Sequence, residues 1–309
     1  MARNDKGNTL SRKQPVVVWL LVGFYVSLVV YPCLRGYWPL ERAKLYVAAA
    51  ESALDKAQKP DDEQFQKAKN FLELARVSDP KIEENIDYLR VLDRVAPIPL
   101  EKLLPALKHL SRATQRSVGM RLAEDAMERK EFEKSYQVLS QIYSYEEEKT
   151  PEERNRLAYG AALAKKDLRL ALREIDVALS ESEIEVPGLL DTKAWILHEL
   201  HDHEDGLIWI DRAIKKLRND LLAAFNPEYE ITKTQLEEFL AAPADDDKTK
   251  DSLKVLQVKN ENLARYFREL AVYEYHRAEI LTSLKETEKA DLSFEWLENR
   301  GFNKFSELF

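Results

Sequence analysis

Small side chains recur in this chain about every 35 residues, each inside the same short pattern. A bulky or turn-forming residue is followed three positions later by a small residue, then four later by a large apolar one, then three later by an apolar or small one. The copies are Phe65, Ala68, Leu72 and Ala75; Phe132, Ser135, Leu139 and Ile142; Leu168, Ala171, Ile175 and Ala178; His203, Gly206, Ile210 and Ala213; and Thr287, Ala290, Phe294 and Leu297. Spacings of three and four keep the last three members on one face of a helix. The chain therefore repeats an amphipathic helix.

A second small residue lies twelve positions upstream of several copies, at Ala123, Ala194 and Ala278. One small side chain on each of two adjacent helices lets the pair approach closely. This arrangement resembles the tetratricopeptide repeat, a helix–turn–helix unit of about 34 residues. The stretches Phe65–Pro80 and Ala194–Leu217 carry the resemblance best, although other residues occupy most of the family's usual Gly and Tyr positions. The resemblance covers roughly residues 41–300 and implies an α-solenoid.

Composition supports an all-α fold. Glycine accounts for only 8 of 309 residues, whereas folds rich in hairpins or phosphate-binding loops need more of it. Hydrophobic residues make up 45% and charged residues 33%, which suits helices with one buried stripe. The net charge of −8 argues against nucleic-acid binding, because no long basic run offers a phosphate-binding surface.

Two stretches interrupt the repeat. Pro97, Pro99 and Pro105 predict a distorted repeat or a loop near residues 81–117. The like positions 206 and 290 are 84 residues apart, which exceeds two 34-residue units. An acidic, proline-marked loop is expected near 241–248, followed by a long helix over about 251–284.

The N-terminal part predicts a membrane anchor. Residues 14–34 carry no charge between Lys13 and Arg35, and about 20 such residues reach across a hydrocarbon core of roughly 30 Å. No polar stripe marks a soluble core helix, and no small-residue cleavage site follows closely enough for a signal peptide. We expect a transmembrane helix over 15–34, with lipid-facing or buried members at Val16, Trp19, Leu20, Phe24, Leu28 and Val30.

The orientation prediction rests on basic residues. The first fourteen residues carry four basic side chains and one acidic one, a net +3, so the remainder of the chain sums to −11. The positive-inside tendency favours a cytoplasmic N-terminus and places the bulk on the opposite side, periplasmic in a bacterium. The expected layout is a basic tail over 1–14, the anchor over 15–34, a solenoid over 35–301 and an apolar tail over 302–309. That tail is expected to cap the solenoid or to dock on a partner.

Motifs for catalysis or cofactor binding are not found. His198, His201 and His203 lie among acidic residues, but the position four after His198 is Asp202, so the zinc-protease pattern is not met. The repeat register puts His201 to His203 in a solvated turn, and His276 is expected to be a surface or half-buried residue. Cys33 is the only cysteine, so an intramolecular disulfide cannot form. The sequence predicts no metal, no cofactor, no small-molecule substrate and no enzyme.

The function expected from the resemblance is protein binding. A solenoid of stacked helix pairs presents an extended groove, and the first helix of each pair would supply the contacts. The groove candidates are Tyr159, Ala162, Trp195 and His198. The leading interpretation is a membrane-anchored scaffold or assembly subunit of a membrane-associated complex. The alternative is a regulatory or chaperone-like module that binds client peptides transiently.

Overall fold

The computed structural model describes residues 31–57, 62–144, 148–224, 232–241 and 261–302. Every regular element in these ranges is a helix, as the composition predicted. The chain divides into two compact units, residues 1–110 and 111–309. The division falls inside the segment 81–117 where prolines interrupt the repeat.

The first unit contains helices α2 (Tyr31–Leu54), α3 (Glu63–Ser78), α4 (Ile86–Val95) and α5 (Leu100–Lys108), with a 3-10 turn, η2, at Pro80–Glu84. Helices α2 and α3 pack along each other, and Ala68, Leu72 and Ala75 are buried. Two arginines join α4 to α2: Arg90 Nη2 lies 2.5 Å from Glu51 Oε1, and Arg94 Nη1 lies 2.8 Å from Asp55 Oδ1.

The sequence predicted a distorted repeat or a loop in the segment 81–117. The structure shows two short helices there, α4 and α5, and the beginning of α6. Pro97 and Pro99 fall in the link between α4 and α5, where no helical hydrogen bond is required. The carboxylate of buried Asp93 accepts a 2.6 Å hydrogen bond from the Ile98 N–H and so fixes this link. Pro105 lies inside the short helix α5.

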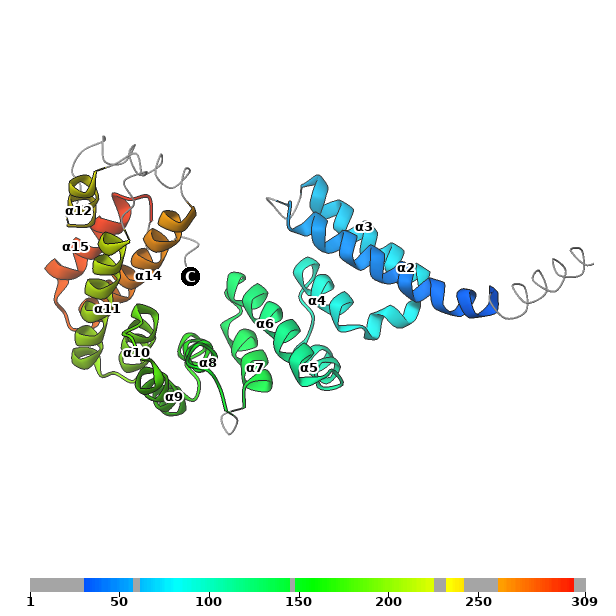
Figure 1. The fold of residues 1–309 in the computed structure, drawn as a ribbon, viewed down its shortest axis with the longest axis horizontal. Helices are drawn as coiled ribbons and strands as arrows, with labels where there is room; N and C mark the ends of the chain where they lie inside the picture. The colour runs from blue at the N-terminus through cyan, green and yellow to red at the C-terminus, as the bar shows by residue number, and fades with distance from the viewer. Residues whose placement is uncertain (1–30, 58–61, 145–147, 225–231, 242–260, 303–309) are drawn as a thin grey trace, which may run out of the picture. The chain divides into compact units, whose positions relative to one another are not determined.

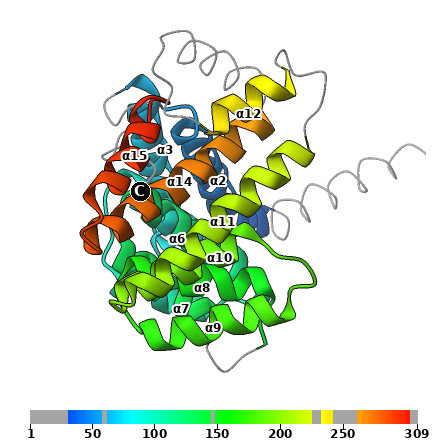
Figure 2. The ribbon, with the colours of Figure 1, turned by 90° about the vertical axis from the view of Figure 1, so that its left-hand side faces the viewer.

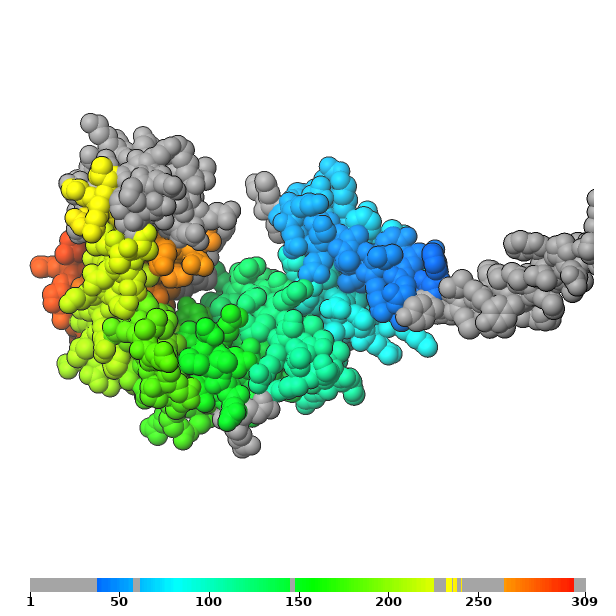
Figure 3. Space-filling view, in the orientation of Figure 1, coloured from blue at the N-terminus to red at the C-terminus, as the bar shows by residue number. Residues whose placement is uncertain are grey.

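The second unit begins with three helix pairs. They are α6 (Arg112–Glu128) with α7 (Phe132–Ile142), α8 (Pro151–Leu163) with α9 (Leu168–Glu181), and α10 (Pro187–Glu199) with α11 (His203–Ala223). Each pair also contacts the next, through α7 and α8 and through α9 and α10. Figure 2 shows α8, α9, α10 and α11 side by side, and in the space-filling view of Figure 3 the green part of the chain that contains them forms a continuous surface.

The chain then reaches α12 (Lys233–Ala241), α14 (Glu261–Ser283) and α15 (Thr287–Glu298). Helix α14 returns to pack against α11 and α10, so segments far apart in sequence meet (Figure 1). Buried Leu190, Ile210, Phe267 and Ile280 belong to the common core of these helices, and Phe302 packs at its edge. The predicted loop at 241–248 and the tail beyond 302 lie outside the described residues, apart from Ala241, which ends α12.

The turns inside the pairs share one conformation. Lys130, Lys165, His201 and Lys285 each follow a helix with a left-handed backbone, at φ of 60, 54, 67 and 63°. In each turn the next N–H bonds a carbonyl five residues back, as from Glu131 N to Ala126 O and from Asp202 N to Leu197 O. These are Schellman caps, which satisfy the last carbonyls of the first helix and reverse the chain.

The small residues of the pattern lie where paired helices approach. Ser135, Ala171, Gly206 and Ala290 are all buried. The Ser135 hydroxyl donates a 2.9 Å hydrogen bond to the Ala123 carbonyl of the preceding helix. A Cβ on Gly206 would lie 3.1 Å from the Ala194 carbonyl oxygen. The backbones of α10 and α11 therefore come too close at this point for a larger side chain.

No helix within the described ranges combines the length and the apolar character that a membrane crossing needs. The anchor residues named above, Val16 to Val30, lie outside the described residues. Residues 31–34 of the predicted span form the first turn of α2.

Candidate functional site

The candidate site is formed by one stripe of side chains on each of α8, α10 and α14. On α8 the stripe is Asn155, Tyr159 and Ala162; on α10 it is Asp191, Trp195 and His198; on α14 it is Glu269, Tyr273 and His276. Each stripe has the spacing i, i+4, i+7, which keeps its members on one face of a helix. We call these nine residues the three-helix face.

Local interactions fix the start of α8. Thr150 and Glu153 form a capping box, with the Glu153 N–H 3.2 Å from Thr150 Oγ1 and the Thr150 N–H 2.9 Å from Glu153 Oε2. Pro151 occupies the first turn, where its missing N–H costs nothing.

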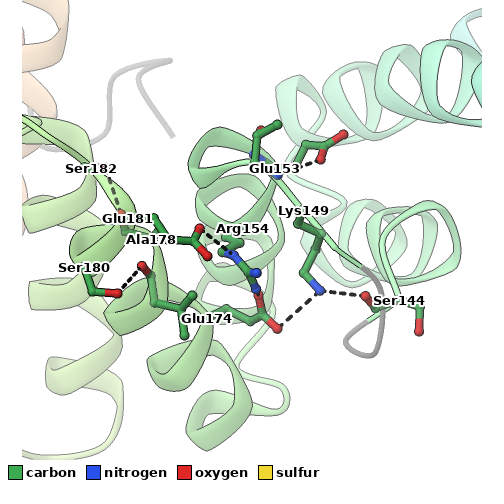
Figure 4. A network of polar contacts seen from close by, with 11 residues as sticks. Ser144, Lys149, Glu153, Arg154, Glu174, Ala178, Ser180, Glu181 and Ser182 are labelled. Carbon is green, nitrogen blue, oxygen red and sulfur yellow. Dashed lines mark hydrogen bonds and ion pairs between the residues drawn. The ribbon is translucent and has the colours of Figure 1, made fainter.

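A buried ion network then holds α8 against α9 (Figure 4). Arg154 Nη1 lies 2.7 Å from Glu174 Oε2, and Lys149 Nζ lies 3.3 Å from the other oxygen of the same carboxylate. Lys149 also donates to the Ser144 carbonyl at 2.7 Å. The start of α8 is thereby fixed, and with it the direction in which Asn155 and Tyr159 point.

At the centre of the face, His276 and Asp191 join α14 to α10. The imidazole Nδ1 lies 2.7 Å from Asp191 Oδ1, and the two residues are 0% and 4% exposed. Our expectation of a surface or half-buried His276 was wrong. Its partner is 85 positions away along the chain, so no local pattern revealed the contact.

Aromatic rings stack around this pair. The Trp195 ring lies between two imidazoles, 4.3 Å from His276 and 4.8 Å from His198 between ring centroids, with interplanar angles of 20 and 14°. Tyr159 approaches His276 at 6.4 Å in a tilted arrangement. The structure thus brings three of the four predicted groove residues together around a histidine that the sequence did not identify as part of the site.

Ala162, the fourth predicted residue, is fully buried and presents no surface to a partner. Its counterpart one repeat later is His198, which is half-buried beside His203 with their Nδ1 atoms 3.2 Å apart. Burial, with repulsion from His203 and other cations, lowers the pKa of His198 to about 4. His201 is exposed in the turn between α10 and α11, where the repeat register placed it.

A cleft of about 460 Å³ opens beside the face, between α8, α10, α11 and α14. Tyr159 and Tyr273 line it, and burial raises the pKa of both phenols well above the ordinary value. Both hydroxyls therefore stay protonated at neutral pH. They offer hydrogen bonds and aromatic surface, not a phenolate.

A second hollow, of about 630 Å³, lies between α11, α12, α14 and α15. Four of its six charged residues form two ion pairs: Arg218 Nη2 lies 2.7 Å from Glu274 Oε1, and Arg277 Nε lies 2.7 Å from Asp211 Oδ1. The first cleft is the better candidate for ligand binding, because members of the three-helix face line it and none of them lines the second hollow.

Among the residues that the structure describes, no group of three or more His, Cys, Asp or Glu side chains is arranged so that it could hold a metal ion. Comparison with protein-family models, with curated proteins and with solved structures finds no match to this chain.

Proposed function

We propose that this chain is a membrane-anchored scaffold that binds other proteins through the three-helix face. The observation that carries the proposal is the gathering of the Tyr159, Trp195 and His198 rings beside buried His276, next to a cleft that Tyr159 lines. Aromatic residues with a polar edge are the side chains most enriched where proteins bind one another. The role proposed is an assembly subunit of a membrane-associated complex.

A tetratricopeptide-like solenoid is the architecture that we propose for residues 111–302. It is supported by three helix pairs that contact in sequence, and by Schellman turns at 130, 165, 201 and 285 that recur 35, 36 and 84 positions apart. The spacing of 36 is one residue longer than the spacing of 35, because the turn between α8 and α9 is one residue longer than the turn between α6 and α7. In this longer turn Asp167 also has a positive φ, of 48°. Stacked pairs of this kind use side chains from the first helix of each pair to bind partners.

Membrane attachment through residues 15–34 is part of the same proposal, supported by the 21 uncharged residues between Lys13 and Arg35. We expect the full chain to remain with membranes after alkaline carbonate washing, and a chain lacking residues 1–35 to be released. Release of both forms would contradict the anchor.

The scaffold role is tested by co-purification from detergent extracts followed by mass spectrometry. Photo-crosslinking amino acids placed at Tyr266, on the rim of the cleft, and at Leu292, an exposed residue of α15, would report contacts on different surfaces. We expect a stoichiometric partner that crosslinks from Tyr266 and not from Leu292. A chain that isolates alone, or crosslinks only from Leu292, would argue against the three-helix face.

A further inference from the structure

The walls of the 460 Å³ cleft have a single electrostatic character. Among the described residues that line it, three carry a charged side chain, and all three are acidic: Asp191, Asp220 and Glu269. Lys216 pairs with Asp220, and Arg265 attracts Glu269, but neither basic residue lines the cleft. Desolvation raises the pKa of Glu269 more than the charge of Arg265 lowers it.

One buried oxygen atom without a partner belongs to a residue that lines the same cleft. Asn155 Oδ1 is buried and has no hydrogen-bond partner among the described residues. Tyr159 and Tyr273 line the same cleft, and Tyr273 is only 5% exposed. Buried polar atoms are nearly always paired, so unpaired ones that border a cleft mark a place where a ligand donates.

Such a cleft favours a ligand group that is flat, positively charged and rich in hydrogen-bond donors. An anion would meet three carboxylates. An apolar side chain would leave the Asn155 side-chain oxygen unpaired. A guanidinium group offers five N–H donors, pairs with carboxylates and stacks on tyrosine rings.

We propose that the cleft receives an arginine side chain from a segment of the partner protein. This inference rests on the proposed scaffold function and specifies the chemistry of its partner. Asp220 and Glu269 attract the guanidinium group, Tyr159 and Tyr273 accept from it and stack on it, and Asn155 accepts from it deeper in the cleft. The Val186, Pro187 and Val272 side chains line the cleft and cover the methylene groups of the arginine.

The test uses the full chain in detergent and fluorescent ten-residue peptides of glycine and serine that contain two arginines, two citrullines or two lysines. Citrulline keeps the shape of arginine and removes its charge. Fluorescence anisotropy should show arginine peptides binding at least tenfold more tightly than citrulline peptides and more tightly than lysine peptides. Equal binding of arginine and citrulline would overturn the proposal, and equal binding of lysine would overturn the selection of guanidinium.

Two double variants locate the binding. Asp220→Asn with Glu269→Gln removes two carboxylates from the cleft and should lower arginine affinity to the citrulline level. Asp291→Asn with Glu295→Gln removes the same charge from exposed positions on α15 and should leave affinity unchanged. An equal loss of arginine affinity in both variants would mean that the net charge of the protein causes the effect. The cleft would then not be the binding site. Circular dichroism checks that each variant folds.

The outcomes for the cleft and for the scaffold are separable. Partners that still co-purify with the Asp220→Asn, Glu269→Gln variant, together with peptides that bind without regard to arginine, would overturn the cleft and leave the scaffold role intact. Selective arginine binding by a chain that never co-purifies with a partner would support the cleft and contradict the scaffold.

Discussion

At the residue scale, the contact between His276 and Asp191 organises the candidate site. It links α14 to α10 in the interior and places the imidazole under the ring of Trp195. Removing one member of a buried polar pair leaves the other in a poorly solvated position. The pair therefore sets both the stability of this region and the shape of the three-helix face.

Asp191→Ala should lower the free energy of unfolding by about 2–4 kcal/mol, because the His276 N–H loses its carboxylate acceptor. Urea unfolding followed by circular dichroism measures this change. Asp176→Ala is a matched control, since Asp176 pairs with Lys193 at 2.7 Å on the exposed side of α9. We expect the control to cost less than about 1 kcal/mol. Equal losses would mean that the His276 contact contributes no more than a surface ion pair.

The half-buried position of His198 should make the free energy of unfolding depend on pH. Its pKa in the folded state is about 4, against an ordinary 6.5. Between these values the unfolded chain binds more protons, so the free energy of unfolding should fall as pH is lowered from 6.5 to 4. His198→Gln should flatten this dependence in urea titrations at several pH values. NMR titration showing protonation of His198 near pH 6.5 would contradict the expectation.

The sequence predicted several of the side chains at the site, but it did not predict the contacts that bring them together. Tyr159 and Trp195 were predicted because the repeat register places both on the first helix of a pair. Asp191 lies one turn before Trp195 on the same stripe, and that spacing was a usable signal. His276 offered none, because its contact depends on α14 folding back across a long connection.

At the scale of single elements, the two helices of each pair in the second unit are joined by a turn that contains a left-handed residue. Glycine adopts this conformation without strain, yet lysine or histidine occupies four of the turns. The pattern in the sequence predicted the small residues between paired helices, at Ser135, Ala171 and Gly206, because small residues mark close helix approach. It placed His203 in the turn, whereas α11 begins at that residue. It did not predict α4 and α5, because prolines that start or flank short helices look the same as prolines that end them.

Lys285→Gly should raise the free energy of unfolding by roughly 0.5–1 kcal/mol, because it relieves the strain of a φ of 63° at an exposed position. Glu295→Gly, in the interior of α15, serves as the opposite control and should cost about 1 kcal/mol. Thermal unfolding of both variants gives the comparison. A loss of stability in Lys285→Gly would show that the lysine side chain itself supports the turn.

Gly206→Val should destabilise the chain by about 1–3 kcal/mol, because even a Cβ lies 3.1 Å from the Ala194 carbonyl oxygen. Asp205→Val introduces the same side chain at the exposed neighbouring position and should cost only a fraction of that amount. Chemical unfolding distinguishes the two. Equal effects would assign the loss to helix propensity and not to the close approach of α10 and α11.

At the scale of the whole molecule, the chain consists of two compact units, residues 1–110 and 111–309. Unit 111–309 contains the three-helix face and both hollows. The all-α class followed from composition. The division at residue 110 was not predicted, because the resemblance to a repeat family treats successive pairs as one continuous array.

A fragment of residues 111–309 should be soluble, strongly helical and cooperative in urea unfolding, since its core residues all lie within it. A fragment of residues 168–309 should fail this test, because it begins at α9 without α8, and would expose Ala171, Ile175 and Ala178. Circular dichroism and size-exclusion chromatography provide the measurement. An unfolded longer fragment would show that the second unit depends on the first.

The return of α14 onto α10 has a consequence for the order in which the protein is made. Helices α6 to α11 contact near neighbours, so they can form as the chain leaves the ribosome. Asp191 must wait for His276, which is synthesised 85 residues later. During that interval Trp195 and the buried carboxylate are without their cover, and a nascent chain that stops before residue 261 exposes them to chaperones.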